Sequence, residues 1–285
     1  MKSTRPASFL ALVIIACCAG SVAAEEHEDA RALALGDSVV FGFITQAGHE
    51  YVNASNFIGS PEYVASMLDL DVANAGCPGE ATSSFLSATG ADHGCRAFRA
   101  AFPLHVAYSS TQMAFARSFL LSHRDVRLVT IGLGANDLFI LEDACATKPN
   151  PQLCIAAGLP ALLATVATNM ATILAELRAT GFGGVIVIVN YYSLDYSDPT
   201  GTGVTQLLNQ AITAPAKAYG AVVADVFTAF QNIVANPVIG GKTCHAGLLN
   251  VDPGDPLNSC DVHPSQSGQQ LIAKTITRAY KAASW

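Results

Sequence analysis

Short apolar segments alternate with helical patterns along this sequence, and this alternation is the feature that most limits the fold. The clearest apolar segment is residues 185–189, in which every residue is valine or isoleucine. Short apolar runs without polar alternation are typical of strands buried on both faces of a parallel sheet. The predicted strands are residues 32–35, 72–74, 127–133, 185–189 and 221–226.

The predicted helices are residues 60–70, 113–123, 159–177, 204–219 and 264–282. In the third of these, apolar residues recur at three- and four-residue steps, which gives the helix one apolar face. Repeated strand–helix units predict an α/β sandwich, with a five-stranded parallel sheet and helices on both faces. Residues 80–111 have no clear pattern, residues 138–158 suggest a long insertion, and residues 191–203 suggest a loop.

The first 24 residues have the pattern of a secretory signal peptide. Lys2 and Arg5 precede an apolar run over residues 9–19, and small residues follow it. That run is short for a membrane span, which needs about 20 apolar residues. We therefore expect a secreted protein without stable membrane insertion, whose mature part, residues 25–285, forms a single domain. Lipid attachment at Cys17 is the alternative.

Composition narrows the class of partner. The chain has 51% hydrophobic residues, which is enough for a sizeable core. Its net charge is −7 and it has no cluster of lysine or arginine, so a nucleic-acid partner is not expected. We expect a monomer.

Six of the eight cysteines lie beyond the leader, and an even number in an exported chain predicts disulfides. Proximity in the sequence suggests the pairs Cys77–Cys95, Cys145–Cys154 and Cys244–Cys260. A zinc site is the alternative for part of this set, because Cys244-His245 and Cys260-x-x-His263 offer four nitrogen or sulfur ligands. Export favours the disulfides, so no metal is expected.

Four polar segments follow predicted strands or precede the last helix, and they could meet at the edge where α/β sheets hold their sites. They are Gly36-Asp37-Ser38, Asn74-Ala75-Gly76-Cys77-Pro78-Gly79, Gly134-Ala135-Asn136-Asp137 and Asp261-Val262-His263-Pro264. Ser38 is the candidate nucleophile, and His263 is the candidate base that accepts its proton. Candidate oxyanion donors are the Asn136 side chain and the backbone N–H groups of Ser38 and Gly76. Each of these residues could instead cap a helix or form a turn, so the prediction depends on all four segments occurring together in this order.

From about residue 31 to the C-terminus, these blocks resemble the SGNH or GDSL hydrolase family, and most of all its secreted bacterial esterase and lipase branch. Gly36-Asp37-Ser38 is similar to the nucleophile block, Asn74-Ala75-Gly76 to the oxyanion glycine block, Gly134-Ala135-Asn136-Asp137 to the Gly-x-Asn-Asp block, and His263-Pro264 to the histidine block. The resemblance implies a flavodoxin-like fold and ester hydrolysis without a cofactor.

The sequence departs from the family pattern at one position. The family usually has an aspartate three residues before the histidine, where this chain has Cys260. Asp261, two residues before His263, is the favoured partner of the imidazole, and a backbone carbonyl of the 258–260 loop is the alternative.

The predicted function is that of an exported serine esterase or lipase that hydrolyses acyl or lipid esters through an acyl-enzyme on Ser38. A carbohydrate O-acetyl esterase is the alternative enzyme with the same residues. A non-catalytic surface binding module is the alternative from a different class. Residues 138–141, which follow the candidate oxyanion asparagine, could line an acyl groove.

Overall fold

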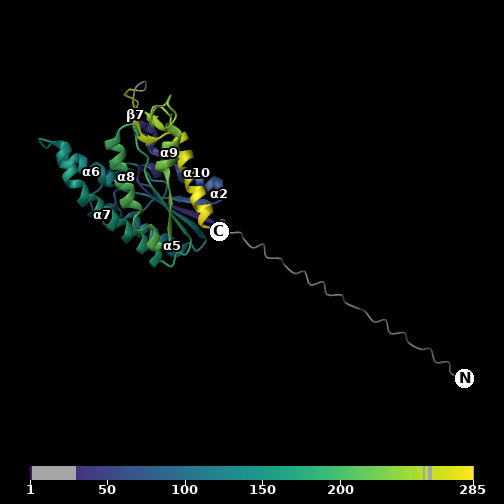
Figure 1. Cartoon of the computed structure of the whole chain (residues 1–285). Coiled ribbons are helices and arrows are strands. Elements are labelled where there is room, and N and C mark those ends of the chain that lie inside the picture. The colour runs from purple at the N-terminus through teal and green to yellow at the C-terminus, as the bar shows by residue number, and fades with distance from the viewer. Residues whose placement is uncertain (2–29, 253, 256–258, 285) are drawn as a thin grey trace.

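A computed structural model describes Met1 and residues 30–252, 254–255 and 259–284 of the chain (Figure 1). Apart from Met1, the predicted leader lies outside these residues, and so does Cys17. In chain order, the first strands and helices are β1 (Arg31–Gly36), α1 (Ser38–Phe41), α2 (Ser60–Leu68), β2 (Asp71–Asn74), α3 (Thr82–Leu86), α4 (Cys95–Ala101), α5 (Gln112–Ser122) and β3 (Val126–Gly132). They are followed by α6 (Ala135–Ala146), α7 (Pro151–Ala179), β4 (Val185–Val189), α8 (Pro199–Thr213), β5 (Ala221–Ala224), α9 (Val226–Val234), β6 (Leu249–Val251), β7 (Cys260–Pro264) and α10 (Gln266–Ala283). Short 3₁₀ turns are η1 (Gly48–Val52), η2 (Ala54–Asn56) and η3 (Ala216–Tyr219).

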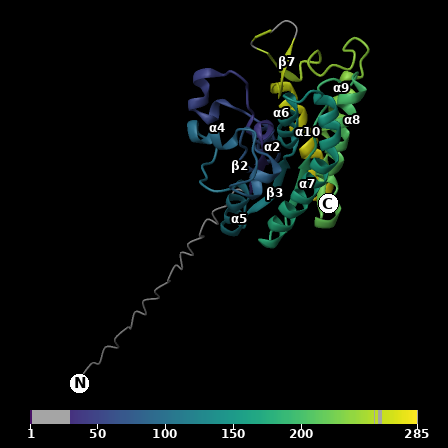
Figure 2. The same ribbon diagram turned by 90° about the vertical axis from the view of Figure 1, so that its left-hand side faces the viewer.

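The main sheet has five parallel strands in the order β2-β1-β3-β4-β5. This is the flavodoxin order of a doubly wound sheet, and it confirms the predicted fold class. The order reverses between β1 and β3, and ligands of such folds bind at that switch point, beyond the carboxyl ends of the strands. β6 and β7 pair separately as an antiparallel ribbon, and β7 lies at the top of both views in Figures 1 and 2.

Helices cover both faces of the sheet because alternate strand residues point to opposite faces. On one face, Leu33, Leu35, Val129 and Ile131 pack against α5, α7 and α8. On the other face, Ala32, Leu128 and Val187 pack against α2, α9 and α10. Figures 1 and 2 show α7 and α8 side by side, with α10 on the far side of the sheet. Both layers of core are buried, so the sheet is the middle of three layers.

The segment predicted as a long insertion, residues 138–158, is helical instead. It forms most of α6 and the first part of α7, which begins at Pro151 rather than at residue 159. The Asn150 side chain accepts a hydrogen bond from the N–H of Leu153, and Pro151 occupies the first turn. An asparagine cap followed by proline is an ordinary helix start. Pro160 lies inside the helix and obscured this start in the sequence pattern.

The boundaries of the next helix were wrong for a related reason. α8 begins at Pro199 rather than at residue 204, because Asp198 caps it through the N–H groups of Thr200 and Gly201. It ends at Thr213, and Pro215 separates it from η3. The predicted loop 191–203 is therefore shorter than expected.

Five further elements were missed, and the start of a sixth was misplaced. α3 and α4 lie in the unassigned segment 80–111, and α9, β6 and β7 had no predicted counterpart. Pro264 is the last residue of β7 rather than part of the last helix, which starts at Gln266 with Ser265 as its cap. As a result, His263 lies on a strand.

The structure contains the three disulfides suggested by sequence proximity, Cys77–Cys95, Cys145–Cys154 and Cys244–Cys260. The bond between Cys244 and Cys260 uses two of the four ligands of the alternative zinc site. Disulfide sulfurs are not thiolates, and zinc binds thiolates, so these four residues do not form that site.

Among the described residues, α7 is the one helix that is long and apolar enough to cross a membrane. It has 29 residues, and its second half contributes Val166, Met170, Ile173 and Leu177 to the core against the sheet. The second half of α7 therefore packs as a core helix.

Candidate active site

Ser38 is the first residue of α1, directly after the carboxyl end of β1. The turn between them requires Gly36, whose φ is +148° and whose missing Cβ would lie 2.1 Å from the Gly132 carbonyl oxygen. Only glycine adopts this backbone at little cost. The close contact of Gly36 with the end of β3 thus places the Ser38 hydroxyl at the switch point of the sheet.

The structure brings Ser38 and His263 together although 225 positions separate them in the sequence. Ser38 Oγ lies 2.9 Å from His263 Nε2, and His263 Nδ1 lies 2.7 Å from Asp261 Oδ2. Because a carboxylate only accepts hydrogen bonds, Nδ1 carries the ring proton, and Nε2 is free to accept the hydroxyl proton of Ser38. The three side chains form one continuous hydrogen-bonded chain.

The strand conformation of β7 explains why an aspartate two residues before the histidine can reach it. Residues i and i+2 of a strand point to the same side, so Asp261 and His263 share one face of β7. The disulfide Cys244–Cys260 fixes the start of this strand, and the Tyr192 hydroxyl donates a 2.6 Å hydrogen bond to the Val262 carbonyl. The alternative partner, a carbonyl of the 258–260 loop, lies partly outside the described residues.

Thr45 is a site residue that sequence reasoning missed. Its hydroxyl donates a 2.6 Å hydrogen bond to Asp261 Oδ2, the oxygen that also faces His263. Burial by itself would raise the pKa of Asp261, but the bond from His263, its charge and the Thr45 hydroxyl outweigh burial and lower that pKa. Asp261 is therefore ionised at neutral pH.

Asp37 supports the turn next to Ser38. It is buried, and its carboxylate accepts hydrogen bonds from the Val39 N–H and from the Tyr191 hydroxyl. Burial raises the pKa of Asp37 to about 6, against the opposing effect of these two bonds and of His263. Tyr191, which is buried rather than part of a solvated loop, thus fixes the residue that caps α1.

The three predicted oxyanion donors differ in what they are free to bind. The Ser38 N–H has no partner within the described part of the chain, as expected for the first turn of a helix. Asn136 is buried and uses one amide proton on the Glu80 carbonyl at 3.0 Å, which leaves a second proton. The Gly76 N–H donates to Asn74 Oδ1 at 2.9 Å, so the geometry favours Ser38 and Asn136 over Gly76 as donors.

A buried acid connects this region to the strand before Ser38. The Gln112 side chain bonds both backbone groups of Gly36, at 2.6 and 3.0 Å, and also donates to Glu80 at 3.2 Å. Burial raises the pKa of Glu80 from 4.5 to about 7, although bonds from Ser84 and Gln112 oppose this. Sequence reasoning did not single out Glu80 or Gln112.

This raised pKa makes stability depend on pH. Between about pH 4.5 and about pH 7 the folded protein holds a proton on Glu80 that the unfolded chain has released, so the free energy of unfolding falls as pH rises. In Glu80→Gln we expect the decrease in the free energy of unfolding over this pH range to be smaller than in the wild type by about 3 kcal/mol, at 1.36 kcal/mol for each pKa unit. Urea unfolding of both proteins across that pH range measures it. Glu176→Gln, at an exposed residue paired with Arg117, is the control, and an unchanged slope in Glu80→Gln would contradict the raised pKa.

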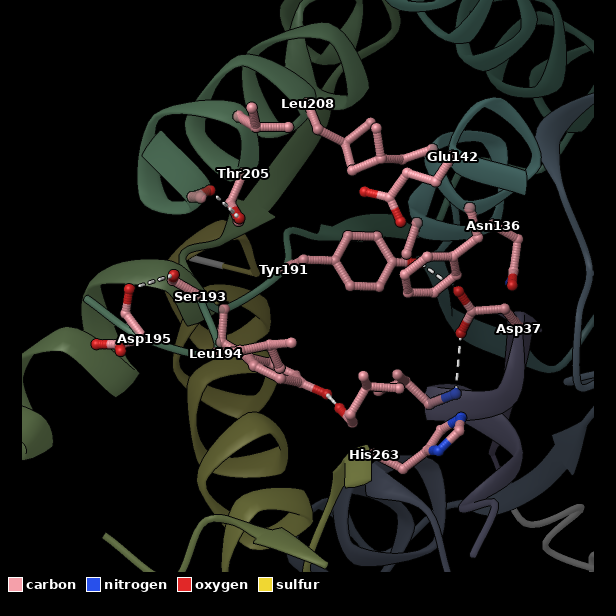
Figure 3. A pocket seen from close by; sticks show the side chains of 18 of the residues that line it. Asp37, Asn136, Glu142, Tyr191, Ser193, Leu194, Asp195, Thr205, Leu208 and His263 are labelled. Carbon is pink, nitrogen blue, oxygen red and sulfur yellow. Dashed lines mark hydrogen bonds between the residues drawn. The ribbon is translucent and has the colours of Figure 1, made fainter. Parts of the chain in front are cut away.

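A cavity of about 470 Å³ opens beside the three hydrogen-bonded side chains (Figure 3). Ser38, His263 and Asn136 line one end of it, and Gly76 is not among its lining residues. Apolar side chains from α6, α7 and α8 form much of the remaining wall, among them Leu138, Phe139, Ile155, Val204 and Leu208. Of the predicted groove residues 138–141, the structure places Leu138 and Phe139 in this wall.

Comparison with known proteins identifies the family of the chain. Residues 34–271 match the GDSL-like lipase/acylhydrolase family. The chain belongs to this family. The range includes each of the four polar segments identified in the sequence, and the family assignment makes the chain a carboxylic ester hydrolase.

Solved structures share the fold of this GDSL-family chain at low sequence identity. An α/β hydrolase enzyme from the metagenome of Lake Arreo, Spain, has a TM-score of 0.53 at 15% identity, and the match covers 89% of this chain and 96% of that one. An acetylxylan esterase from Geobacillus stearothermophilus has a TM-score of 0.51 at 17% identity, with 88% and 94% covered. Phospholipase A1 from Streptomyces albidoflavus has a TM-score of 0.50 at 16% identity, with 90% and 98% covered. No curated protein matches the chain in sequence.

Proposed function

We propose that this hydrolase cleaves acyl and lipid esters through a covalent acyl-enzyme on Ser38. The observation that carries the proposal is the hydrogen-bonded chain from the Ser38 hydroxyl through His263 to Asp261, with distances of 2.9 and 2.7 Å. A serine hydroxyl is a weak nucleophile at neutral pH, and a positioned base that removes its proton activates it.

In the first half of the reaction, Ser38 Oγ attacks the carbonyl carbon of the ester, and its proton passes to His263 Nε2. The negative charge that develops on the carbonyl oxygen is stabilised by the Ser38 N–H and the free proton of Asn136. His263 then gives its proton to the leaving alcohol as the ester bond breaks. Asp261 stays ionised and stabilises the imidazolium between these two transfers.

In the second half, water attacks the acyl-enzyme, and His263 takes a proton from that water. The tetrahedral intermediate collapses, the carboxylic acid leaves, and the proton returns to Ser38 Oγ. Both halves need the same residues, so no cofactor is required.

The size of the cavity supports acyl groups longer than acetate. Its volume is about 470 Å³, and apolar side chains such as Leu138, Val204 and Leu208 form much of its wall. An acetyl group has one methyl and would leave most of this apolar surface exposed to water. Each further buried methylene contributes about 0.8 kcal/mol to binding, so a longer chain is favoured.

We expect kcat/KM for p-nitrophenyl esters to rise by up to about 15-fold for each two methylenes from acetate to a medium chain. The measurement is a panel of esters of graded length, together with a phospholipid and an acetylated xylan. A strict preference for acetate on sugars would overturn the acyl or lipid assignment in favour of the carbohydrate O-acetyl esterase. Absence of turnover with every ester would favour the non-catalytic binding module.

We also propose that the protein is exported, with residues 1–24 removed. The leader pattern supports this, as do three disulfides, which persist in oxidising compartments. N-terminal sequencing of the mature protein tests it. A start near Glu25 supports cleavage, whereas a lipid-modified start at Cys17 would contradict it.

A further inference from the structure

Glu142 places a carboxylate in the apolar wall of the cavity. It follows Leu138 by four residues and Phe139 by three on α6, and these separations put the three side chains on one face of a helix. All three line the cavity. Figure 3 shows the Glu142 carboxylate pointing into the cavity on the side of Tyr191.

The other acidic residues of the cavity wall already have partners. The lining acids are Asp37, Glu142, Asp195 and Asp198, and the lining residues include no lysine or arginine. Asp37 accepts the Tyr191 hydroxyl, Asp195 faces Lys242 at 3.2 Å, and Asp198 caps α8. Within the described part of the chain, no hydrogen bond or ion pair reaches the Glu142 carboxylate.

The charged neighbours of Glu142 do not neutralise it. Burial raises its pKa, the adjacent Asp143 raises it further, and His93 lowers it. Asp143 is exposed and lies 3.1 Å from His93 Nε2, so that pair faces solvent. Glu142 is partly buried, and a ligand that fills the cavity would remove water from its carboxylate, so a cation on that ligand would offset the cost of losing this water.

We propose that Glu142 is the counter-ion for a positively charged group on the acyl chain of the substrate. The proposal rests on the ester-hydrolase function above and names the class of ester: one whose acyl part carries a cation. The rings of Phe139 and Tyr191, which line the same cavity, add to the binding, because cations are attracted to aromatic faces.

The position of Glu142 assigns the cation to the acyl part rather than to the alcohol. His263 on β7 gives its proton to the leaving alcohol, so the alcohol departs on the β7 side. Glu142 is instead on α6, six residues beyond Asn136, or about 9 Å along the helix at 1.5 Å per residue. With its carbonyl oxygen at the Asn136 amide, an extended acyl chain of medium length spans a comparable distance along α6.

The experiment compares kcat/KM for three p-nitrophenyl esters: the hexanoate, the ω-trimethylammonio-hexanoate and the half-ester of adipate. Their acyl chains are similar in length and end in a neutral, a positive and a negative group. For the wild-type protein we expect the cationic ester to exceed the anionic ester by at least about 100-fold, and Glu142→Gln to reduce that ratio by at least about tenfold. A charge-assisted contact contributes enough for such a factor.

Asp143→Asn is the matched control, because it removes the same charge from the next residue, which does not line the cavity. Its ratio of cationic to anionic ester is expected to equal that of the wild type. If Asp143→Asn and Glu142→Gln lowered the ratio of cationic to anionic ester equally, the proposal would be overturned, because the effect would then come from the negative charge of this region and not from a contact with Glu142. An unchanged ratio in Glu142→Gln would overturn it as well.

A fourth substrate separates the two sides of the ester. Choline hexanoate carries the cation on the alcohol, and hexanoate release reports its hydrolysis. Dependence on Glu142 for this ester but not for the cationic acyl ester would overturn the acyl assignment. Turnover of the neutral hexanoate by the wild type tests the proposed function separately, so its failure is distinguishable from failure of the Glu142 proposal.

Discussion

Replacing Ser38 with alanine is expected to lower kcat for p-nitrophenyl hexanoate by at least about 10⁴-fold. Ser38 Oγ is the atom that His263 Nε2 faces at 2.9 Å, and alanine has no atom to attack the ester carbonyl. The rate that remains would come from the oxyanion donors and from substrate binding alone. Initial rates at saturating substrate measure the loss.

The folded structure should be almost unaffected by this substitution, because the one side-chain hydrogen bond described for Ser38 is the contact with His263. Ser55→Ala, at an exposed serine of η2, is the control and should keep wild-type turnover. Turnover by Ser38→Ala within a few-fold of wild type, with an unchanged melting temperature, would exclude Ser38 as the nucleophile.

Asp261→Asn is expected to lower kcat by about 10³–10⁴-fold. The aspartate holds the proton on His263 Nδ1 through a 2.7 Å contact, and Thr45 donates to the same oxygen. The Val262 N–H donates to Asp261 Oδ1 at 2.6 Å, so it holds the carbonyl oxygen of the asparagine at that position, and the NH₂ takes the place of Oδ2 toward the ring. The imidazole then carries its proton on Nε2, where it cannot accept the proton of Ser38.

Asp252→Asn makes the same chemical change in the segment between β6 and β7 and serves as the control. It should retain most of the activity, since Asp252 accepts bonds only from its own loop among the described residues. Near-wild-type kcat in Asp261→Asn would indicate that a backbone carbonyl orients the histidine, and would remove Asp261 from the mechanism.

The sequence predicted the sheet well because buried strands of this fold are local apolar runs. Residues 185–189 were predicted to the residue, and β1, β2, β3 and β5 lie within one or two residues of the expected bounds. Helix starts were harder where a proline followed the cap, as at Asn150 and Asp198. In these cases the capping residue and the proline after it indicate where the helix starts, and the spacing of apolar residues does not locate the start.

In the candidate site, too, the residues within local sequence motifs were predicted, and those whose roles depend on contacts between distant segments were not. Ser38, Asn136 and His263 occur in short segments with recognisable spacing, so the sequence points to them directly. Thr45 and Gln112 have no such signal, because a threonine and a glutamine acquire their roles only when distant backbone and carboxylate groups fold against them. The Asp261 spacing became interpretable once β7 was known to be a strand.

The most direct measurement is to treat the protein with a fluorophosphonate, digest it and identify the modified residue by mass spectrometry. An activated serine displaces fluoride and keeps the phosphonyl group on its oxygen. A single adduct on Ser38, formed far more slowly in His263→Ala, is the expected result. An adduct on another residue, or no adduct in a protein that hydrolyses esters, would contradict nucleophilic catalysis by Ser38.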